Sequence, residues 1–205
     1  MNAADTHLAA SDPVMARLIA SRGPIERDES GPPPDLYAAL LRAITGQQLS
    51  VRAALAIHGR LLARFGGRPP TPRELLDDDP EEMRAAAGLS RAKVVSLRSL
   101  AQHVLDGELE IGRLRELDDA DVARDLIAVK GIGEWTAQMF LMFTLHRPDV
   151  VATGDQGIRN AVRRAYGLDA VPDAAALTTL AEPWRPYRTR ACLYLWRSLD
   201  NVPVA

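Results

Sequence analysis

The sequence predicts an all-α fold of about ten helices. Apolar residues recur at three- and four-residue steps through most of the 205-residue chain, as they do from Val51 to Phe65. Aspartate, serine or threonine stands where many of these segments begin, and glycine or proline where many end. Strand signals are nearly absent, and neither an internal repeat nor a composition break forces a domain boundary.

The expected helices follow one another along the chain. Asp12 is placed to cap the first, and residues 22–34, with two glycines and four prolines, form a loop. The expected segments are 13–20, 35–46, 51–65, two short helices starting at Pro72 and Pro80, 91–106, 119–129, 134–146, 155–166, 173–181 and 186–199. Segment 134–146 is apolar on nearly every side, which predicts a buried central helix.

Composition bounds the class of protein. Hydrophobic residues make up 47% and charged residues 25% of the chain, as in ordinary globular proteins. A single cysteine, Cys192, excludes an internal disulfide and argues against an iron–sulfur cluster. No apolar run is long enough to span a membrane and no secretory signal precedes the first helix, so we expect a cytoplasmic protein. The net charge is −2, but seven arginines face four acids from Gln156 onward, and such a local basic face can bind phosphates.

A short glycine-containing turn joins two of the expected helices. In Val129-Lys130-Gly131-Ile132-Gly133, either glycine can adopt a positive φ and let the chain reverse. The next helix then begins with unpaired amides that a phosphate oxygen can approach, with Lys130 adding a positive charge. The alternative is a tight helix–helix turn without a ligand.

Asp155 lies about twenty residues further on, in a Thr-Gly-Asp turn. An aspartate before Gln156-Gly157-Ile158 is a reasonable helix cap. A carboxylate in a dry pocket is also suited to stabilise positive charge on a sugar whose glycosidic bond is breaking. Spacing alone leaves both interpretations open.

Five stretches together resemble the helix-hairpin-helix (HhH-GPD) DNA glycosylases, and among them the AlkA-type 3-methyladenine DNA glycosylase II group. The stretches are 43–50, 88–93, 126–137, 151–155 and 184–191, and the resemblance covers roughly residues 35–200. It implies two packed helical subdomains with DNA and the base pocket in the cleft between them. Residues 35–117 and 118–200 would contribute helices to either side of a single domain, after an N-terminal helix and loop at 1–34. We expect no counterpart of the N-terminal β domain of longer AlkA enzymes.

The resemblance also implies roles for individual residues. Asp155 would be catalytic, no cofactor would be required, and the hairpin would hold a structural monovalent cation, Na⁺ or K⁺. The implied phosphate-binding residues are Gly131, Gly133, Lys130 and Thr136, and the implied cation ligands are the backbone carbonyls of Ile127, Val129 and Ile132. The implied base pocket is Trp135, Trp196, Met139 and Gln156, and the residue filling the gap left by a flipped base would be Gln48 or Leu49.

Trp135 determines the expected reaction type. Relatives that also cut the DNA backbone carry a lysine at this position to form a Schiff base, so tryptophan predicts a monofunctional enzyme. The implied substrates are 3-methyladenine and 7-methylguanine in double-stranded DNA. Met139 and Gln156 replace tyrosines of the AlkA pattern, which suggests a more open pocket and, as a hypothesis, 1-methyladenine and 3-methylcytosine as well. We expect a bacterial monomer that reaches the nucleoid through DNA and does not bind membranes.

Three alternatives remain open. The first is a non-catalytic helix-hairpin-helix DNA-binding module, which has no need of a carboxylate facing a negatively charged duplex. The second is a glycosylase for another lesion or mispair class. The third is an all-α protein whose hairpin only packs helices.

Overall fold

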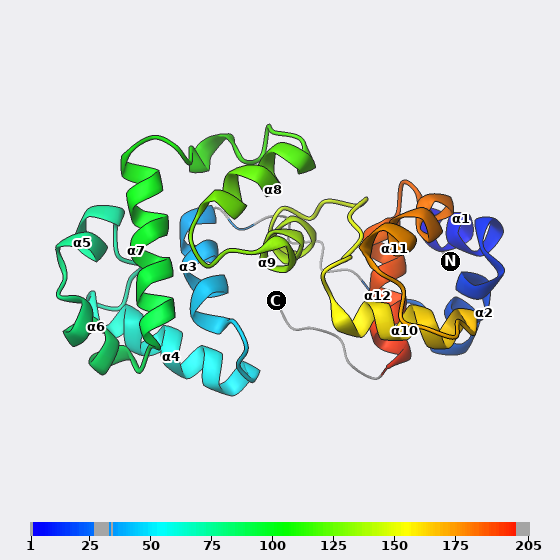
Figure 1. Cartoon of the computed structure of the whole chain (residues 1–205), viewed down its shortest axis with the longest axis horizontal. Helices are drawn as coiled ribbons and strands as arrows, with labels where there is room; N and C mark the ends of the chain where they lie inside the picture. Colours follow the sequence, from blue (N-terminus) through cyan, green and yellow to red (C-terminus); the bar gives the residue numbers. More distant parts are fainter. Residues whose placement is uncertain (1, 27–32, 34, 200–205) are drawn as a thin grey trace. The chain divides into compact units, whose positions relative to one another are not determined.

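Helices form all the regular structure in the computed structural model, which describes residues 2–26, 33 and 35–199 (Figure 1). The α-helices are α1 (Ala3–Ser11), α2 (Pro13–Arg22), α3 (Leu36–Gly46), α4 (Val51–Arg64), α5 (Pro72–Asp77), α6 (Pro80–Ala87), α7 (Arg91–Leu105), α8 (Asp119–Ala128), α9 (Glu134–Met139), α10 (Gln156–Tyr166), α11 (Ala174–Leu180) and α12 (Arg188–Ser198). Short 3-10 helices lie at Ile111–Arg113 and Glu182–Trp184. The all-α prediction is confirmed, and the described residues contain no strand.

Local capping chemistry sets many helix starts. The side chains of Asp12, Ser50, Ser90 and Asp118 each accept amide hydrogen bonds in the first turn of the helix that follows, and for Asp12 this was predicted. Thr71 and Glu74 form a reciprocal capping box at the start of α5. These caps fix where each helix begins.

Two elements differ from expectation. Helix α1 was not predicted, because its alanine-rich sequence has no apolar stripe and buries only Asp5 and Leu8. The helix expected at 134–146 is α only to Met139 and continues as a π-helical segment, Phe140–Thr144. Its start is not buried either, since Trp135 is 39% exposed. The loop expected at 22–34 lies mostly outside the described residues.

The chain divides into two compact units, one of which is Pro33–Phe140. Helix α7 is its central element and packs against α3, α5 and α6, while α3 and α6 also contact α4, and α8 packs on α9 (Figure 1). Its core is made of fully buried aliphatic side chains, among them Leu40, Leu61, Met83, Leu97 and Leu100. This unit contains the glycine turn.

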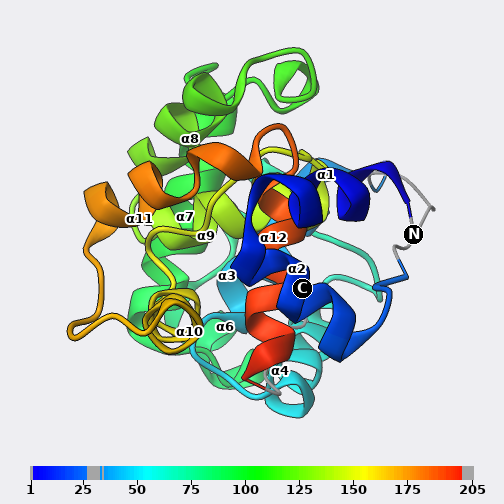
Figure 2. The ribbon, with the colours of Figure 1, turned by 90° about the vertical axis from the view of Figure 1, so that its right-hand side faces the viewer.

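The second unit combines Met1–Pro32 with Leu141–Ala205. Helix α12 packs against α2 and α10, and α1 packs against α2 (Figure 2). Asp12 links three of its segments, because it caps α2 and accepts hydrogen bonds from the Tyr166 hydroxyl and, at 2.8 Å, from Trp184 Nε1. The N-terminal helices are therefore part of the unit that carries Asp155.

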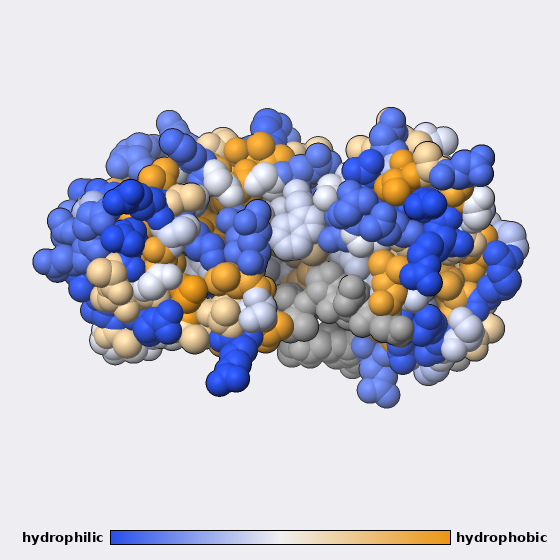
Figure 3. Space-filling model, turned by 60° about the horizontal axis from the view of Figure 1, so that its bottom comes forward, coloured by the Kyte–Doolittle hydropathy of each residue, from blue (hydrophilic) through white to orange (hydrophobic). Residues whose placement is uncertain are grey.

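By these contacts the division falls after Phe140, whereas the resemblance implied one between residues 117 and 118. Helices α8 and α9 belong with the helices before them, because the glycine turn is fixed to α7. Hydrophilic side chains predominate on the face drawn in Figure 3, with smaller apolar patches among them. Within the described ranges, no helix is both long and apolar enough to cross a membrane.

Candidate functional site

The two glycines of the hairpin have different backbone conformations. Gly131 has φ +89°, and a Cβ there would lie 1.9 Å from Ser96 Oγ on α7. Gly133 has φ −98° and ψ 176°, an extended conformation, and a Cβ there would meet no atom within 4 Å. Of the two glycines that could adopt a positive φ, only Gly131 does so, because the chain reverses at the first glycine. Nothing in the packing around Gly133 requires a glycine.

Some amides of the hairpin are already hydrogen-bonded and others are available to a ligand. Lys130 N–H donates to Ser99 Oγ at 3.0 Å, and Ile132 N–H donates to the Val129 carbonyl at 3.0 Å. The amides of Gly131 and Gly133 make no hydrogen bond with the described part of the chain. They are the two amides that the sequence analysis assigned to phosphate.

Gln47 connects the hairpin to the turn that follows α3. Its Nε2 donates to the Gly131 carbonyl at 3.0 Å and to Thr136 Oγ1 at 3.1 Å. The Thr136 hydroxyl, expected to face phosphate, is buried and accepts this bond. Sequence reasoning missed Gln47, because its partners lie more than eighty positions away; only its place within the family-like segment 43–50 pointed to it.

The turn itself presents the two residues expected to fill the gap in DNA. Gln48 is exposed with φ 58°, a conformation that costs a non-glycine residue roughly 1–2 kcal/mol. Leu49 is 39% exposed. Lys93 Nζ on α7 donates to the Thr45 carbonyl at 2.8 Å, and burial lowers the pKa of this lysine. Helix α7 therefore holds the start of this turn as well as the hairpin.

Three backbone carbonyls were expected to hold a cation. Ile127 lies in the last turn of α8 and Val129 follows its end, where the helix dipole favours positive charge, whereas Ile132 lies in the hairpin. Oxygen donors of this kind suit a hard cation. The Val129 carbonyl also accepts the Ile132 amide. Among the described residues, no group of three His, Cys, Asp or Glu side chains is placed to hold a metal ion.

Asp155 is a buried helix cap that also binds a tryptophan. It is 9% exposed, and its Oδ1 accepts the Ile158 amide at 2.7 Å as the cap of α10. The same oxygen accepts Trp196 Nε1 at 2.9 Å. A Cβ at Gly157 would lie 2.9 Å from Oδ1 and 3.6 Å from the Trp196 ring, so a glycine leaves room for this contact. Capping and side-chain orientation therefore support each other.

The residues expected in the base pocket differ in burial. Trp196 is 1% exposed and lies 5.9 Å from Phe143, ring centre to ring centre. Trp135 is exposed on α9, and Met139 is half-buried one turn further on. Gln156 is exposed, and its Nε2 donates to Asn160 Oδ1 at 3.1 Å. Asp155, Gln156 and Trp196 belong to one unit, and Trp135, Met139, the hairpin and Gln48 to the other.

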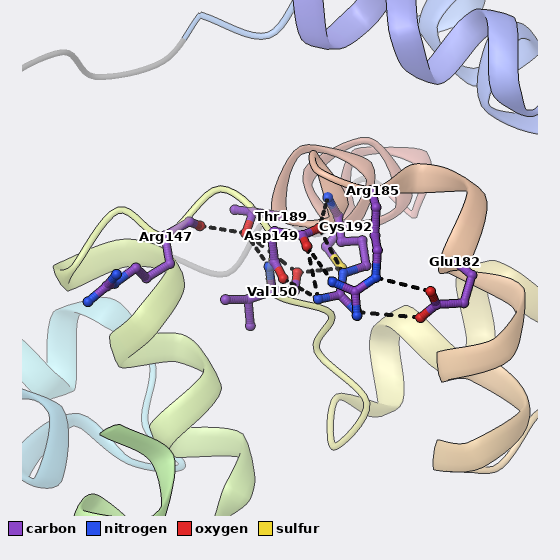
Figure 4. Close-up of polar contacts among 8 residues, drawn as sticks. Arg147, Asp149, Val150, Glu182, Arg185, Thr189 and Cys192 are labelled. Atoms are coloured by element: carbon purple, nitrogen blue, oxygen red, sulfur yellow. Dashed lines mark hydrogen bonds and ion pairs between the residues drawn. The ribbon is translucent and has the colours of Figure 1, made fainter. Parts of the chain in front are cut away.

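The loop before Asp155 is anchored to α12 (Figure 4). Thr189 Oγ1 donates to the Arg147 carbonyl at 2.7 Å and accepts the Val150 amide at 3.1 Å. Arg188 Nε and Arg185 Nη1 bind the two oxygens of Asp149 at 2.8 and 2.7 Å. The family-like segment 184–191 therefore holds the residues that lead to the catalytic candidate.

These ion pairs also correct the expectation of a basic face from Gln156 onward. Arg185 and Arg188 are paired with Asp149, and Arg190 is buried against Asp5, with Nη2 2.8 Å from Oδ2. Arginines brought together in sequence here serve internal contacts. The sequence excess of positive charge overstates what is available to DNA.

Cys192 is buried beside the same loop, with Sγ 4.0 Å from the Val150 carbonyl (Figure 4). Burial raises the pKa of this thiol to about 12. Since the thiolate is the reactive form, Cys192 is not a nucleophile in the folded protein.

Comparison with known proteins places these features in a family context. Residues 41–186 match the model of the "HhH-GPD superfamily base excision DNA repair protein". The chain is 36% identical over 197 residues to DNA-3-methyladenine glycosylase 1 of Schizosaccharomyces pombe, covering 95% of this chain and 86% of that protein. A solved structure of S. pombe 3-methyladenine DNA glycosylase in complex with abasic DNA superposes with a TM-score of 0.83 at 33% identity, covering 100% of both chains.

A second solved structure, DNA-3-methyladenine glycosidase from Bacillus halodurans, has a TM-score of 0.83 at 34% identity, covering 96% of this chain and 89% of that one. Because the relatives include a yeast as well as bacteria, they give no support to the expected bacterial origin.

Proposed function

The chain belongs to the HhH-GPD superfamily of base excision DNA repair proteins, and on that premise we propose that it is a monofunctional DNA glycosylase for alkylated bases. The proposed reaction hydrolyses the N-glycosidic bond of the damaged nucleotide in duplex DNA and leaves an abasic site. The observation that carries the proposal is the buried carboxylate of Asp155, held by the Ile158 amide and the Trp196 indole.

Asp155 is the proposed catalytic residue. As the base departs with the bonding electrons, positive charge develops on the sugar, and a fixed carboxylate stabilises that charge or orients the attacking water. An alkylated purine already carries positive charge, so it leaves without strong acid catalysis. The tight hold on Oδ1 supports this role, because a preoriented group needs no reorganisation during reaction.

The glycine amides are the proposed phosphate contact. Gly131 and Gly133 N–H are uncommitted within the described chain, and no side chain at either position shields them. Lys130 is exposed next to them and adds charge. A Na⁺ or K⁺ ion held by the carbonyls of Ile127, Val129 and Ile132 would supply further positive charge toward the phosphate. The position of Ile127 and Val129 at the end of α8 fits such an ion.

Taking the damaged base out of the duplex costs a few kcal/mol. A protein residue must then occupy the space that the base leaves. We assign this role to the turn that displays Gln48 and Leu49, because both are exposed and Gln48 is held in a left-handed conformation. The amide of Gln48 would hydrogen-bond the orphaned base.

Trp135 is the proposed stacking surface for a cationic base. Its exposed ring can contribute a cation–π attraction of roughly 0.5–2 kcal/mol, which favours charged lesions over normal bases. The proposed substrates are 3-methyladenine and 7-methylguanine. Because Met139 and Gln156 replace tyrosines of the AlkA pattern, we also include 1-methyladenine and 3-methylcytosine. We assign Trp196 to orienting Asp155, because its ring is almost wholly buried.

The test uses duplexes that each carry one defined lesion, incubated with the protein and then treated with alkali. We expect strand cleavage only after alkali, and a fall of about 10³-fold or more in the excision rate of Asp155→Asn. Asparagine keeps the cap and an acceptor for Trp196, so the variant should fold. Unchanged excision by this variant would favour a non-catalytic role for Asp155, and cleavage without alkali would contradict the monofunctional assignment.

A further inference from the structure

Gln47 joins two parts of the chain that the proposed function uses separately. It directly precedes Gln48 and Leu49, which we assign to filling the gap in DNA. Its side chain reaches the other way, to the hairpin that we assign to the phosphate. We propose that Gln47 is a positioning residue that holds the gap-filling turn in register with the phosphate-binding hairpin, an inference that rests on the proposed function.

The two bonds of Gln47 reach both sides of the glycine turn. One goes to the carbonyl of Gly131, the residue at which the chain reverses, and the other to the hydroxyl of Thr136 in the first turns of α9. Both use Nε2, which has two hydrogens to donate. A single side-chain amide therefore joins the two sides of the hairpin. It also fixes the backbone of Gln47, and with it that of Gln48.

The backbone around Gln47 explains why side-chain contacts are needed to hold the turn between α3 and α4 in place. Helix α3 ends at Gly46, α4 begins at Val51, and the residues between have no helical ladder along their length. Gln48 has a positive φ, which a non-glycine residue keeps only when its surroundings hold it there. Lys93 holds Thr45 at the start of this turn, and Gln47 holds its middle. Lys93 belongs to α7, which also binds the hairpin, and Gln47 binds the hairpin directly.

This arrangement makes a specific prediction about DNA. A protein bound to an undamaged duplex uses the phosphate contact alone, whereas a duplex with a missing base also engages Gln48 and Leu49. If Gln47 sets the distance between the two contacts, its loss weakens only the second mode. A merely structural residue would weaken both modes and lower the melting temperature.

The experiment compares wild type, Gln47→Met and a control, Gln102→Ala. Methionine has nearly the length of glutamine but no donor, and it adds no charge near phosphate. Gln102 is exposed on α7, where its amide binds Asp106 and touches none of the proposed contacts. Binding is measured to an undamaged duplex and to the same duplex carrying a tetrahydrofuran abasic analogue, with 2-aminopurine opposite it to report stacking.

For Gln47→Met we expect binding to the undamaged duplex within twofold of wild type, binding to the abasic duplex about tenfold weaker, and a reduced 2-aminopurine signal. Combined with Gln48→Ala, the loss on abasic DNA should be much less than the product of the two single losses, because both act on one contact. Multiplicative losses, or equal weakening on both duplexes, would overturn the role of Gln47. A wild type that neither prefers abasic DNA nor excises alkylated bases would instead contradict the proposed function.

Discussion

The hairpin turn and the Asp155 turn both end in the cap of a helix, but they prepare that helix start differently. Gly133 precedes α9 without a side-chain cap, and its amide and that of Gly131 are left uncommitted. Asp155 precedes α10 with a full side-chain cap and accepts a second bond from Trp196. The first helix start is open to an anion, and the second already holds one of its own. One turn thus suits binding a phosphate, and the other suits stabilising a cation.

The largest expected effect on stability comes from substituting the first of the two hairpin glycines, with the second as its comparison. Gly131→Ala must overcome both a positive φ and the clash with Ser96, and we expect it to lower the free energy of unfolding by about 2–5 kcal/mol. Gly133→Ala has open space and an ordinary φ, so it should fold normally. Chemical denaturation of both variants measures the difference.

DNA binding then tests why Gly133 is a glycine. We expect Gly133→Ala to bind duplex DNA about tenfold more weakly, with the slope of log binding constant against log salt reduced by about one phosphate contact. Wild-type affinity in Gly133→Ala would show that the open space beside this residue is not used by DNA.

A smaller effect is expected at the second turn, from removing the bond that Trp196 donates to Asp155. A hydrogen bond to a charged group is worth about 1.5–3 kcal/mol, so we expect kcat of Trp196→Phe to fall about 10- to 150-fold, with KM nearly unchanged. The control is Trp184→Phe, which removes an equivalent indole bond to Asp12 in the same unit. It should lose stability but not rate, and equal rate losses would rule out a positioning role for Trp196.

The anchor of the loop before Asp155 should matter less. Thr189→Val removes the hydroxyl that joins the Arg147 carbonyl to the Val150 amide, and leaves a buried amide unpaired. We expect a stability loss of about 1–3 kcal/mol and a modest fall in kcat. Thr178→Val on the exposed face of α11 is the matched control. A thermal melt and a single-turnover assay distinguish the two.

The smallest expected effects are losses of stability at low pH. They should begin at a different pH in each of the two units. Burial, helped by the charge of Arg42, lowers the pKa of His58 in α4. The contribution of neutral His58 to stability is therefore complete above the unfolded pKa of about 6.5 and is lost as pH falls below that value.

In the other unit, burial alone would raise the pKa of Asp12, but hydrogen bonds from Tyr166 and Trp184 outweigh it and lower the pKa. That contribution is present above the ordinary value of 3.8 and is lost only as pH falls through the lower folded pKa. Hydrogen exchange between pH 7 and 3 should therefore show the unit with α4 losing protection first, and the reverse order would contradict this assignment.

Sequence predicts the elements whose signals are local. Helices such as α4 and α7 carry both a cap and an apolar stripe, and both were located closely. Helix α1 was missed because its alanines give no stripe. The π-helical segment after Met139 was missed because the apolar run continues unchanged through it.

The candidate site was predictable in its types of residue but not in their connections. Asp155 and the glycine turn were found by spacing and resemblance. The bond from Trp196 to Asp155 spans 41 positions, and that from Gln47 to Gly131 spans 84, so no local pattern reveals either. Equally, Gly131 and Gly133 look alike in sequence, and only their packing against α7 distinguishes them.

The burial of Cys192 has a practical consequence for spectroscopy. Because the only native thiol is enclosed and its pKa is raised to about 12, maleimide reagents should leave the folded protein unlabelled at neutral pH. A single cysteine introduced at an exposed alanine, Ala56 on α4 or Ala175 on α11, would then carry the entire fluorophore signal without removal of the natural residue. Each unit can thus be followed separately while the protein searches DNA.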